Sequence, residues 1–259
     1  LKDCQEVYHL AADMGGIGWI TVERAEAATN NVRIDVSMLR AADHFNVDRF
    51  FYSSSACAYP VHLQDLPLLP GLKESDAIPA NPEPGYGWEK LYAEQLCKYY
   101  LQDYGLETRV ARFHNCYGIE GTYEGGREKA PAALCRKIAL ANPGDTVEVW
   151  GDGSATRSFM YIDDCVDGIY RIMRSGHSDP LNLGSEQLIS IKDLANLILD
   201  ISGKKNDVEL QFDATKPRGV MGRNSDNTLL REVTGWEPQI SLEEGLEKLY
   251  FWIEGQVRP

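Results

Sequence analysis

The chain has 259 residues, of which 43% are hydrophobic and 25% are charged, a composition typical of a globular protein with a sizeable core. Its formal charge is −13 at pH 7, and a strongly acidic protein repels nucleic acid and anionic membranes, so we expect neither as a partner. No apolar run reaches the roughly 18 residues that a membrane span requires.

The six cysteines are scattered along the chain, and no two lie within three residues of each other. This spacing indicates neither a zinc site nor a disulfide framework, so we expect no bound metal and a reducing, cytoplasmic location. The start at Leu1 lacks the basic and apolar sections of a signal peptide. It also lacks an initiator methionine, which is compatible with processing or truncation.

Short apolar runs alternate with amphipathic stretches through the first half of the chain. Apolar runs that end at glycines or serines are typical of buried strands, and apolar residues three or four positions apart are typical of helices. This order predicts a parallel sheet with helices on both faces. The expected elements are strands at 6–12, 47–52 and 107–113, helices at 25–45 and 86–104 with Gly105 at the C-cap, and a loop at 60–85.

The second half is more mixed and has no repeats or obvious linkers. Capping-box patterns predict helix starts at Ser190 and Ser241. The other expected elements are short strands at 147–150 and 159–162, and a helix that Asp163 or Asp164 caps and that runs to Met173.

Tyr86 and Lys90 are the first candidates for chemistry. Four positions apart on a helix, they lie on one face. A neighbouring ammonium favours the phenolate, so we expect the pKa of Tyr86 to lie below its usual value of about 10. Such pairs are also common on ordinary surface helices, so the pair alone is weak evidence.

Ser53, Ser54 and Ser55 follow the second expected strand, and the carboxyl edge of an open α/β sheet is where ligands bind. A serine there could hold a substrate hydroxyl or carbonyl while the tyrosine exchanges its proton, although a serine-rich turn is the ordinary explanation. Serines at a strand end, a long loop and then Tyr-x-x-x-Lys on a helix are more specific together than apart. In these features the chain resembles the extended short-chain dehydrogenases/reductases, which epimerise, dehydrate or reduce nucleotide-linked sugars.

Five stretches narrow the resemblance and cover nearly the whole chain. The specific part combines a cysteine two residues after Ser55 with a Gly-Gly-Arg-Glu-Lys-Ala-Pro run at 125–131. In these features the chain is similar to the GDP-mannose 3,5-epimerases. The other matching stretches lie at 11–16, 112–118 and 222–227.

The resemblance implies an NAD-dependent reaction on a nucleotide sugar, most specifically GDP-mannose converted to GDP-L-galactose. Oxidation at C4 acidifies the hydrogens at C3 and C5, and inversion then needs a base on one face and an acid on the other. By resemblance, Cys57 is the base, Lys129 the acid and Tyr86 the group that takes the hydroxyl proton. Lys90 tunes Tyr86 and holds the nicotinamide ribose, and Ser55 orients the C4 oxygen.

These residues also have ordinary explanations, since a cysteine near a strand end is usually a small core residue and Lys129 could be a solvated lysine. The cations Arg127, Lys129, Arg136 and Lys137 cluster in an acidic chain, which suits a nucleotide diphosphate but also a basic helix face. The resemblance further implies NAD contacts from Ala11, Ala12, Tyr86 and Lys90. It implies substrate contacts from Gly15, Ser55, Ala56, Cys57, Asn115, Glu128, Lys129, Ala130, Lys137, Ala155, Thr156, Arg157 and Arg223.

The resemblance implies a fold with a Rossmann-like doubly wound parallel sheet, incomplete at its N-terminus, and a smaller mixed α/β substrate-binding part. We assign residues 1–116 to the NAD-binding part and 117–259 mainly to the substrate-binding part. The Gly-x-Gly-x-x-Gly turn that grips pyrophosphate does not occur in the 259 residues: Gly15-Gly16-Ile17-Gly18 does not continue the pattern.

Several departures and alternatives remain open. Met221, Ala155 and Trp88 stand where the family pattern favours an arginine, a polar residue and a smaller apolar residue. The alternatives are a 4-epimerase or 4,6-dehydratase acting on another nucleotide sugar, and a non-catalytic fragment that binds a nucleotide sugar. By analogy with the family, helices 25–45 and 86–104 form a homodimer surface.

Overall fold

The central sheet of the protein has four parallel strands. The computed structural model describes residues 1–16, 18, 21–217 and 219–258. The strands of this sheet pair in register, with Tyr8 opposite Phe51 and Phe51 opposite Arg109. The strand order is β1 (Glu6–His9), β2 (Arg49–Ser55), β3 (Glu107–Phe113) and β7 (Leu181–Leu183). The prediction of a parallel α/β fold is therefore confirmed.

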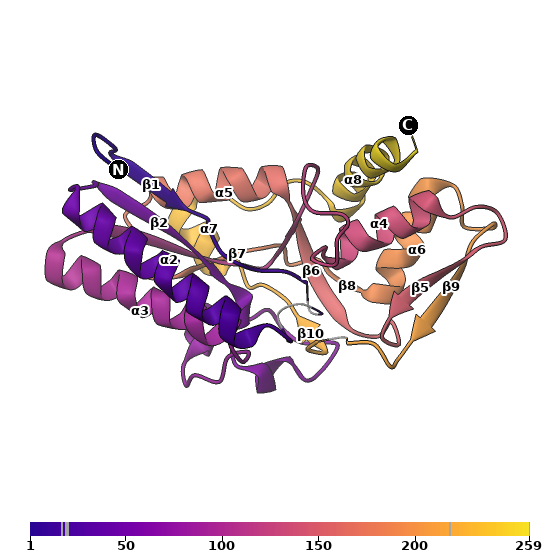
Figure 1. Cartoon of the computed structure of the whole chain (residues 1–259), viewed down its shortest axis with the longest axis horizontal. Helices are drawn as coiled ribbons and strands as arrows, with labels where there is room; N and C mark the ends of the chain where they lie inside the picture. Colours follow the sequence, from indigo (N-terminus) through magenta and orange to yellow (C-terminus); the bar gives the residue numbers. More distant parts are fainter. Residues whose placement is uncertain (17, 19–20, 218, 259) are drawn as a thin grey trace.

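Alternation along β2 explains why helices cover both faces of this sheet. Phe50 and Tyr52 point to one face and join a core with Leu39 and Cys97, whereas Phe51 points to the other face and packs with Ile172. Helices α2 (Arg24–His44) and α3 (Tyr86–Tyr104) lie along one face, and α5 (Ile162–Arg174) and α7 (Thr228–Thr234) lie against the other (Figure 1).

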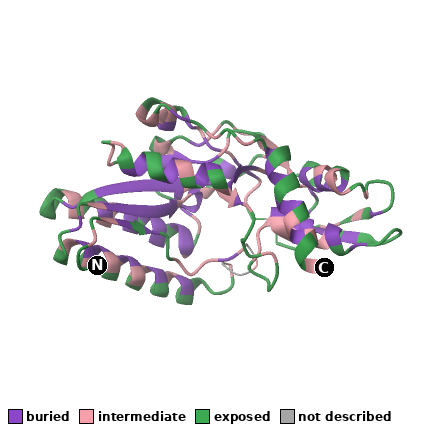
Figure 2. Cartoon of the chain, turned by 90° about the horizontal axis from the view of Figure 1, so that it is seen from above, coloured by how far each residue is buried: buried purple, intermediate pink, exposed green. Residues whose placement is uncertain are grey.

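A smaller mixed α/β part lies at the other end of the molecule, so the two chain termini are far apart (Figure 1). Figure 2 shows the strands of the central sheet as buried and the outer faces of the helices as exposed. One group of strands is β4 (Asn115–Tyr117), β6 (Thr156–Tyr161), β8 (Leu188–Ser190) and β10 (Gly222–Arg223), and β5 (Thr146–Trp150) pairs with β9 (Glu209–Asp213). The helices of this part are α4 (Ala130–Leu140), α6 (Ile191–Ser202) and α8 (Leu242–Val257).

Most of the predicted elements are confirmed, some to the residue. Helix α3 has the predicted bounds, and Gly105 takes the left-handed conformation (φ 76°) while its N–H donates to Leu101 O. Ser190 and Ser241 each accept a backbone N–H at the start of a helix, as predicted. Strand β2 is longer than predicted because Ser53–Ser55 pair with Ala111–Phe113.

The predicted cap of α5 is wrong. Tyr161 is the N-cap residue, and Asp163 and Asp164 lie in the first helical turn. The Asp164 carboxylate accepts the backbone N–H groups of Gln239 and Ile240, so it fixes a distant segment. The expected loop at 60–85 contains two short 3₁₀ helices, Val61–Gln64 and Glu74–Ala77.

Two further points concern the chain as a whole. Among the described residues, no helix is both long enough and apolar enough to cross a membrane. The division of the chain at residue 116 stays a prediction.

Candidate active site

A cavity of about 570 Å³ lies at the carboxyl edge of the central sheet. Its lining comes from the ends of β1, β2 and β3 on one side and from α4, β5 and β6 on the other. The lining includes all five predicted catalytic residues, Ser55, Cys57, Tyr86, Lys90 and Lys129. The remaining predicted residues in the lining are Ala12, Gly15, Ala56, Asn115, Glu128, Ala130, Lys137, Ala155, Arg157 and Arg223.

Lys90 is fixed beneath this cavity. The residue is 1% exposed, and its ammonium donates to Ser53 O at 3.1 Å, so it holds the end of β2. The same atom lies 5.6 Å from the centre of the Tyr86 ring and 4.8 Å from that of Tyr52. Tyr86 and Lys90 therefore lie close together on one face of their helix, as predicted, and this face is buried.

We expected the pKa of Tyr86 to lie below its usual value, and this prediction is wrong: the surrounding protein groups raise it. Burial raises the pKa of the Tyr86 hydroxyl, and the nearby Cys57 and Glu89 raise it further. The Ser55 hydroxyl partly offsets this rise. Sequence spacing could predict the proximity of Lys90 but not the desolvation, which depends on how deeply α3 packs.

Cys57 lies in a short 3₁₀ helix, Ala56–Ala58, directly after β2. The Ser55 hydroxyl caps this turn by accepting the Cys57 N–H at 3.1 Å. Burial raises the pKa of the Cys57 thiol, and the positive charge of Arg223 opposes this rise. Cys57 is 8% exposed as a residue, and it lines the cavity.

Arg223 contacts the thiol, and Gln64 and Glu83 in turn contact Arg223. Arg223 Nη1 donates to Cys57 Sγ at 3.3 Å, and Arg223 Nε donates to Gln64 Oε1 at 2.6 Å. Glu83 pairs with Arg223 at 3.6 Å. The sequence predicted Arg223 as a substrate ligand but gave no sign of Gln64 or Glu83, because neither stands in a recognisable pattern with Cys57.

The opposite wall is built where residues 14–16 meet the Gly-rich run before α4. A Cβ on Gly16 would lie 2.7 Å from Glu128 O, and Gly16 N donates to Arg127 O at 3.1 Å. Glycine therefore permits this close approach. Lys129 stands at the N-cap position of α4 and lines the cavity.

The four cations that cluster in the sequence, between residues 127 and 137, do not all lie at the cavity. Arg127 pairs with Asp13 at 2.9 Å, and Arg136 lies 3.9 Å from Glu124. Of the four cations, Lys129 and Lys137 line the cavity. Among the described lining residues, five cations outnumber four anions in this acidic chain. The cations are Lys90, Lys129, Lys137, Arg157 and Arg223, and the anions are Glu83, Glu128, Glu148 and Asp152.

Strands β4 and β6 bring two more predicted residues to the cavity. Asn115 Nδ2 donates to Ser158 O at 3.0 Å, and Arg157 donates to the carbonyl oxygens of Thr156 and Val220. Burial, with a smaller contribution from the neighbouring Arg223, lowers the pKa of Arg157 to about 10. Two adjacent guanidinium groups favour an anion beside them.

Two predicted residues lie outside the cavity lining. Ala11 is exposed beside Ala12, and Thr156 is buried with its hydroxyl donating to Pro67 O. Their predicted contacts with cofactor and substrate stay predictions.

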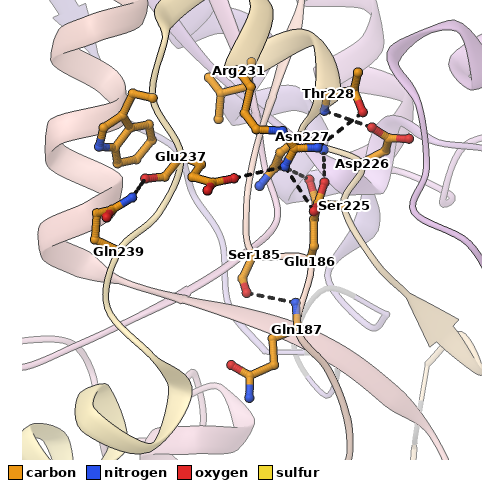
Figure 3. Close-up of polar contacts among 12 residues, drawn as sticks. Ser185, Glu186, Gln187, Ser225, Asp226, Asn227, Thr228, Arg231, Glu237 and Gln239 are labelled. Carbon is orange, nitrogen blue, oxygen red and sulfur yellow. Dashed lines mark hydrogen bonds and ion pairs between the residues drawn. The ribbon is translucent and has the colours of Figure 1, made fainter.

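A second, smaller hollow of about 250 Å³ lies near α7. Arg231 Nη1 pairs with Glu186 at 3.1 Å and with Glu237 at 3.2 Å (Figure 3). Asn227 donates to Gly184 O through its side chain and to Glu186 through its backbone N–H. These polar groups satisfy one another, so their role is to join α7 to neighbouring loops.

Comparison with known proteins agrees with this geometry. Residues 1–184 match the NAD dependent epimerase/dehydratase family. The chain is 48% identical over 251 residues to GDP-mannose 3,5-epimerase 1 of Oryza sativa subsp. indica. It is 30% identical over 269 residues to GDP-L-fucose synthase of Escherichia coli (strain K12). The matched regions are 97% of this chain and 65% of the rice protein, and 98% of this chain and 81% of the bacterial protein.

Among solved structures, UDP-glucose 4-epimerase of Thermotoga maritima with UDP-glucose superposes with a TM-score of 0.84 at 26% identity. The match covers 98% of this chain and 78% of that chain. The parallel sheet and the Ser55, Tyr86 and Lys90 arrangement define a Rossmann-type short-chain dehydrogenase/reductase. More specifically, the chain belongs to the NAD dependent epimerase/dehydratase family. It spans 65% of the length of the GDP-mannose 3,5-epimerases that it matches.

Proposed function

We propose that this chain carries out the NAD-dependent epimerisation of GDP-mannose at C3 and C5, which yields GDP-L-galactose. The observation that carries the proposal is the convergence of Cys57, Tyr86, Lys90 and Lys129 on one cavity. The rice relative and a 47% identical Arabidopsis thaliana relative both bear the name GDP-mannose 3,5-epimerase. A volume of about 570 Å³ falls in the range of small-molecule sites.

The residues present fit the nicotinamide end of the cofactor. Ala12, Tyr86 and Lys90 line the cavity at the carboxyl edge of β1 and β2, where such sheets bind dinucleotides. A bound oxidised nicotinamide supplies a reversible hydride acceptor for the sugar C4, and its positive charge favours the phenolate of Tyr86. Tyr86 takes the proton of the C4 hydroxyl, and Lys90 fixes the end of β2 through Ser53 O.

Inversion at C3 and C5 is assigned to the thiol and the amine. The ketone at C4 makes the neighbouring C–H groups acidic, the Cys57 thiolate removes a proton, and the Lys129 ammonium returns one to the other face. Cys57 comes from the turn after β2, whereas Lys129 comes from the start of α4. The two groups therefore approach a bound sugar from different parts of the fold.

Arg157 and Lys137 are proposed to bind the diphosphate. Both line the cavity in the part that includes α4 and β6. The guanidinium of Arg157 can bind phosphate oxygens in a bidentate manner. Arg223 already contacts Cys57, Gln64 and Glu83, so its contact with phosphate stays a prediction.

Product analysis tests the function. The chain, in its complete natural polypeptide, is incubated with NAD and GDP-mannose, and the nucleotide sugars are separated and identified by NMR. GDP-L-galactose is the expected product. A product inverted at C4 alone from a UDP-sugar, or a 4-keto-6-deoxy product, would assign the chain to one of the other family reactions. Binding of a nucleotide sugar without turnover of any tested substrate would favour the non-catalytic alternative.

A homodimer through α2 and α3 is also proposed. These helices pack side by side on one face of the sheet, and α3 exposes Trp88, Tyr92 and Tyr99 at 51%, 52% and 49%. Large aromatic side chains on one helix mark an interaction surface. A second copy of the same face would cover them by two-fold symmetry. The cytoplasmic location stays a prediction.

A further inference from the structure

Cys57 and Glu83 are joined through two independent connections. The backbone N–H of Glu83 donates to Cys57 O at 3.1 Å, so the loop before α3 is fastened to the turn that carries the thiol. The Glu83 carboxylate pairs with Arg223, whose Nη1 donates to Cys57 Sγ. One residue therefore contacts both the backbone of Cys57 and the cation beside its sulfur.

Arg223 has a second anchor that does not depend on Glu83. Its Nε donates to Gln64 Oε1 at 2.6 Å, and Gln64 is fully buried with its amide nitrogen bonded to Pro60 O. The hydrogen bond to Gln64 therefore anchors the guanidinium through an atom that does not contact Glu83. This allows the charge of Glu83 to be tested separately from the position of Arg223.

We propose that Glu83 is a positioning residue for Cys57, which holds the thiol turn through its backbone and offsets the charge of Arg223 through its carboxylate. The proposal rests on the proposed function insofar as Cys57 acts as a base. A guanidinium alone would favour the thiolate, and the added carboxylate opposes it, so that sulfur can both accept and release a proton.

Two further titratable side chains, besides Glu83 and Arg223, lie near the Cys57 sulfur. Tyr86 on α3 and Arg157 on β6 both interact electrostatically with Cys57. Glu83 raises the pKa of Cys57 and Arg223 lowers it, against the larger rise caused by burial. Substitution of Glu83 by a neutral residue removes one of the groups that disfavour the thiolate.

The test is the pH dependence of Cys57 alkylation by iodoacetamide, followed on the Cys57 peptide by mass spectrometry so that the other five cysteines do not interfere. It needs neither cofactor nor turnover, so it can fail independently of the proposed function. Glu83→Gln keeps the backbone N–H and the side-chain shape. We expect its alkylation midpoint to fall by about one pH unit.

Glu186→Gln is the matched control, because Glu186 also pairs with an arginine but lies near α7, outside the cavity lining. Its midpoint should equal that of the wild type. An unchanged or raised midpoint in Glu83→Gln would overturn the proposal.

Glu83→Asp provides a second variant should Glu83→Gln fail to fold. Its carboxylate is one methylene farther from Arg223, so we expect the alkylation midpoint to fall by less than in Glu83→Gln. An unchanged or raised midpoint would contradict the proposal. In turnover assays, Glu83→Gln should change the pH profile of kcat with little effect on KM. A change in KM alone would indicate a role in substrate binding and would also count against the proposal.

Discussion

The carbonyl oxygen of Cys57 occupies the space that a side chain on Gly87 would need. Gly87 follows Tyr86 in the first turn of α3, so the absence of a Cβ lets the helix start directly against the thiol turn. This contact sets the separation of the phenol and the thiol. It also explains why a glycine stands inside the Tyr-x-x-x-Lys pattern.

Gly87→Ala should destabilise the fold by about 1–3 kcal/mol, because a backbone carbonyl cannot move aside as a flexible side chain can. Urea unfolding measures this change. Gly255→Ala on α8 is the control, since a Cβ there meets no atom within 4 Å, and alanine favours helix. A Gly87→Ala variant as stable as the control would mean that the helix start is not tightly packed on Cys57.

Tyr86→Phe should lower kcat by about 10²- to 10⁴-fold while leaving the fold intact, because it removes only the hydroxyl that exchanges a proton. Steady-state kinetics with GDP-mannose measure the loss, and circular dichroism checks the fold. Tyr104→Phe, at the exposed end of the same helix, should retain wild-type activity. Retention of activity in Tyr86→Phe would remove Tyr86 from the mechanism.

Glu89 should make stability fall as pH rises. Burial raises the pKa of this carboxyl to about 7 from the usual 4.5, and its Oε2 has no hydrogen-bond partner among the described residues. Between these values the folded protein binds more protons than the unfolded chain, so the free energy of unfolding decreases with rising pH. Below pH 4.5 Glu89 is protonated in both the folded and the unfolded protein, so it no longer makes the free energy of unfolding depend on pH.

Glu89→Gln removes this proton uptake. Its free energy of unfolding relative to the wild type should therefore increase from pH 5 to pH 8, by up to about 3 kcal/mol. Urea unfolding at the two pH values measures the change, and Glu247→Gln on the exposed side of α8 is the control. A difference that stays constant between the two pH values would show that Glu89 is ionised throughout this range.

The proposed dimer predicts that Tyr92→Arg combined with Tyr99→Arg gives the mass of a single copy of the polypeptide in light scattering. The wild type should have twice that mass. Tyr170→Arg, at an exposed site on α5 on the opposite side of the sheet, should leave the mass unchanged. If the wild type is already monomeric, the aromatic face of α3 serves another purpose.

Sequence patterns predicted those parts of the fold that local physics determines. Helix α3 and strand β3 were predicted with the observed bounds, since Gly105 can terminate the helix and the segment 107–113 follows that glycine directly. The end of β2 was not predicted, because serines resemble a turn until the neighbouring strand pairs with them. The cap of α5 was wrong for a similar reason, since Asp164 binds a segment 75 residues away.

The candidate site was predicted through its residue types and not through its contacts. Cys57, Tyr86, Lys90 and Lys129 were identified by resemblance, and they line one cavity. The contacts of Glu83 and Gln64 with Arg223 join positions 140 and 159 residues apart, and no sequence spacing encodes them. The pKa of Tyr86 likewise depends on burial, which the helix pattern could not measure.

Solvent hydrogen exchange tests the central claim most directly. With GDP-mannose and NAD in deuterium oxide, the wild type in its complete natural polypeptide should place deuterium at C3 and C5 of the recovered nucleotide sugar. Cys57→Ser and Lys129→Met should lose most of this incorporation while still binding the substrate. A wild type that oxidises and reduces C4 but incorporates no deuterium at C3 or C5 would contradict the assignment of the thiol and the amine as base and acid.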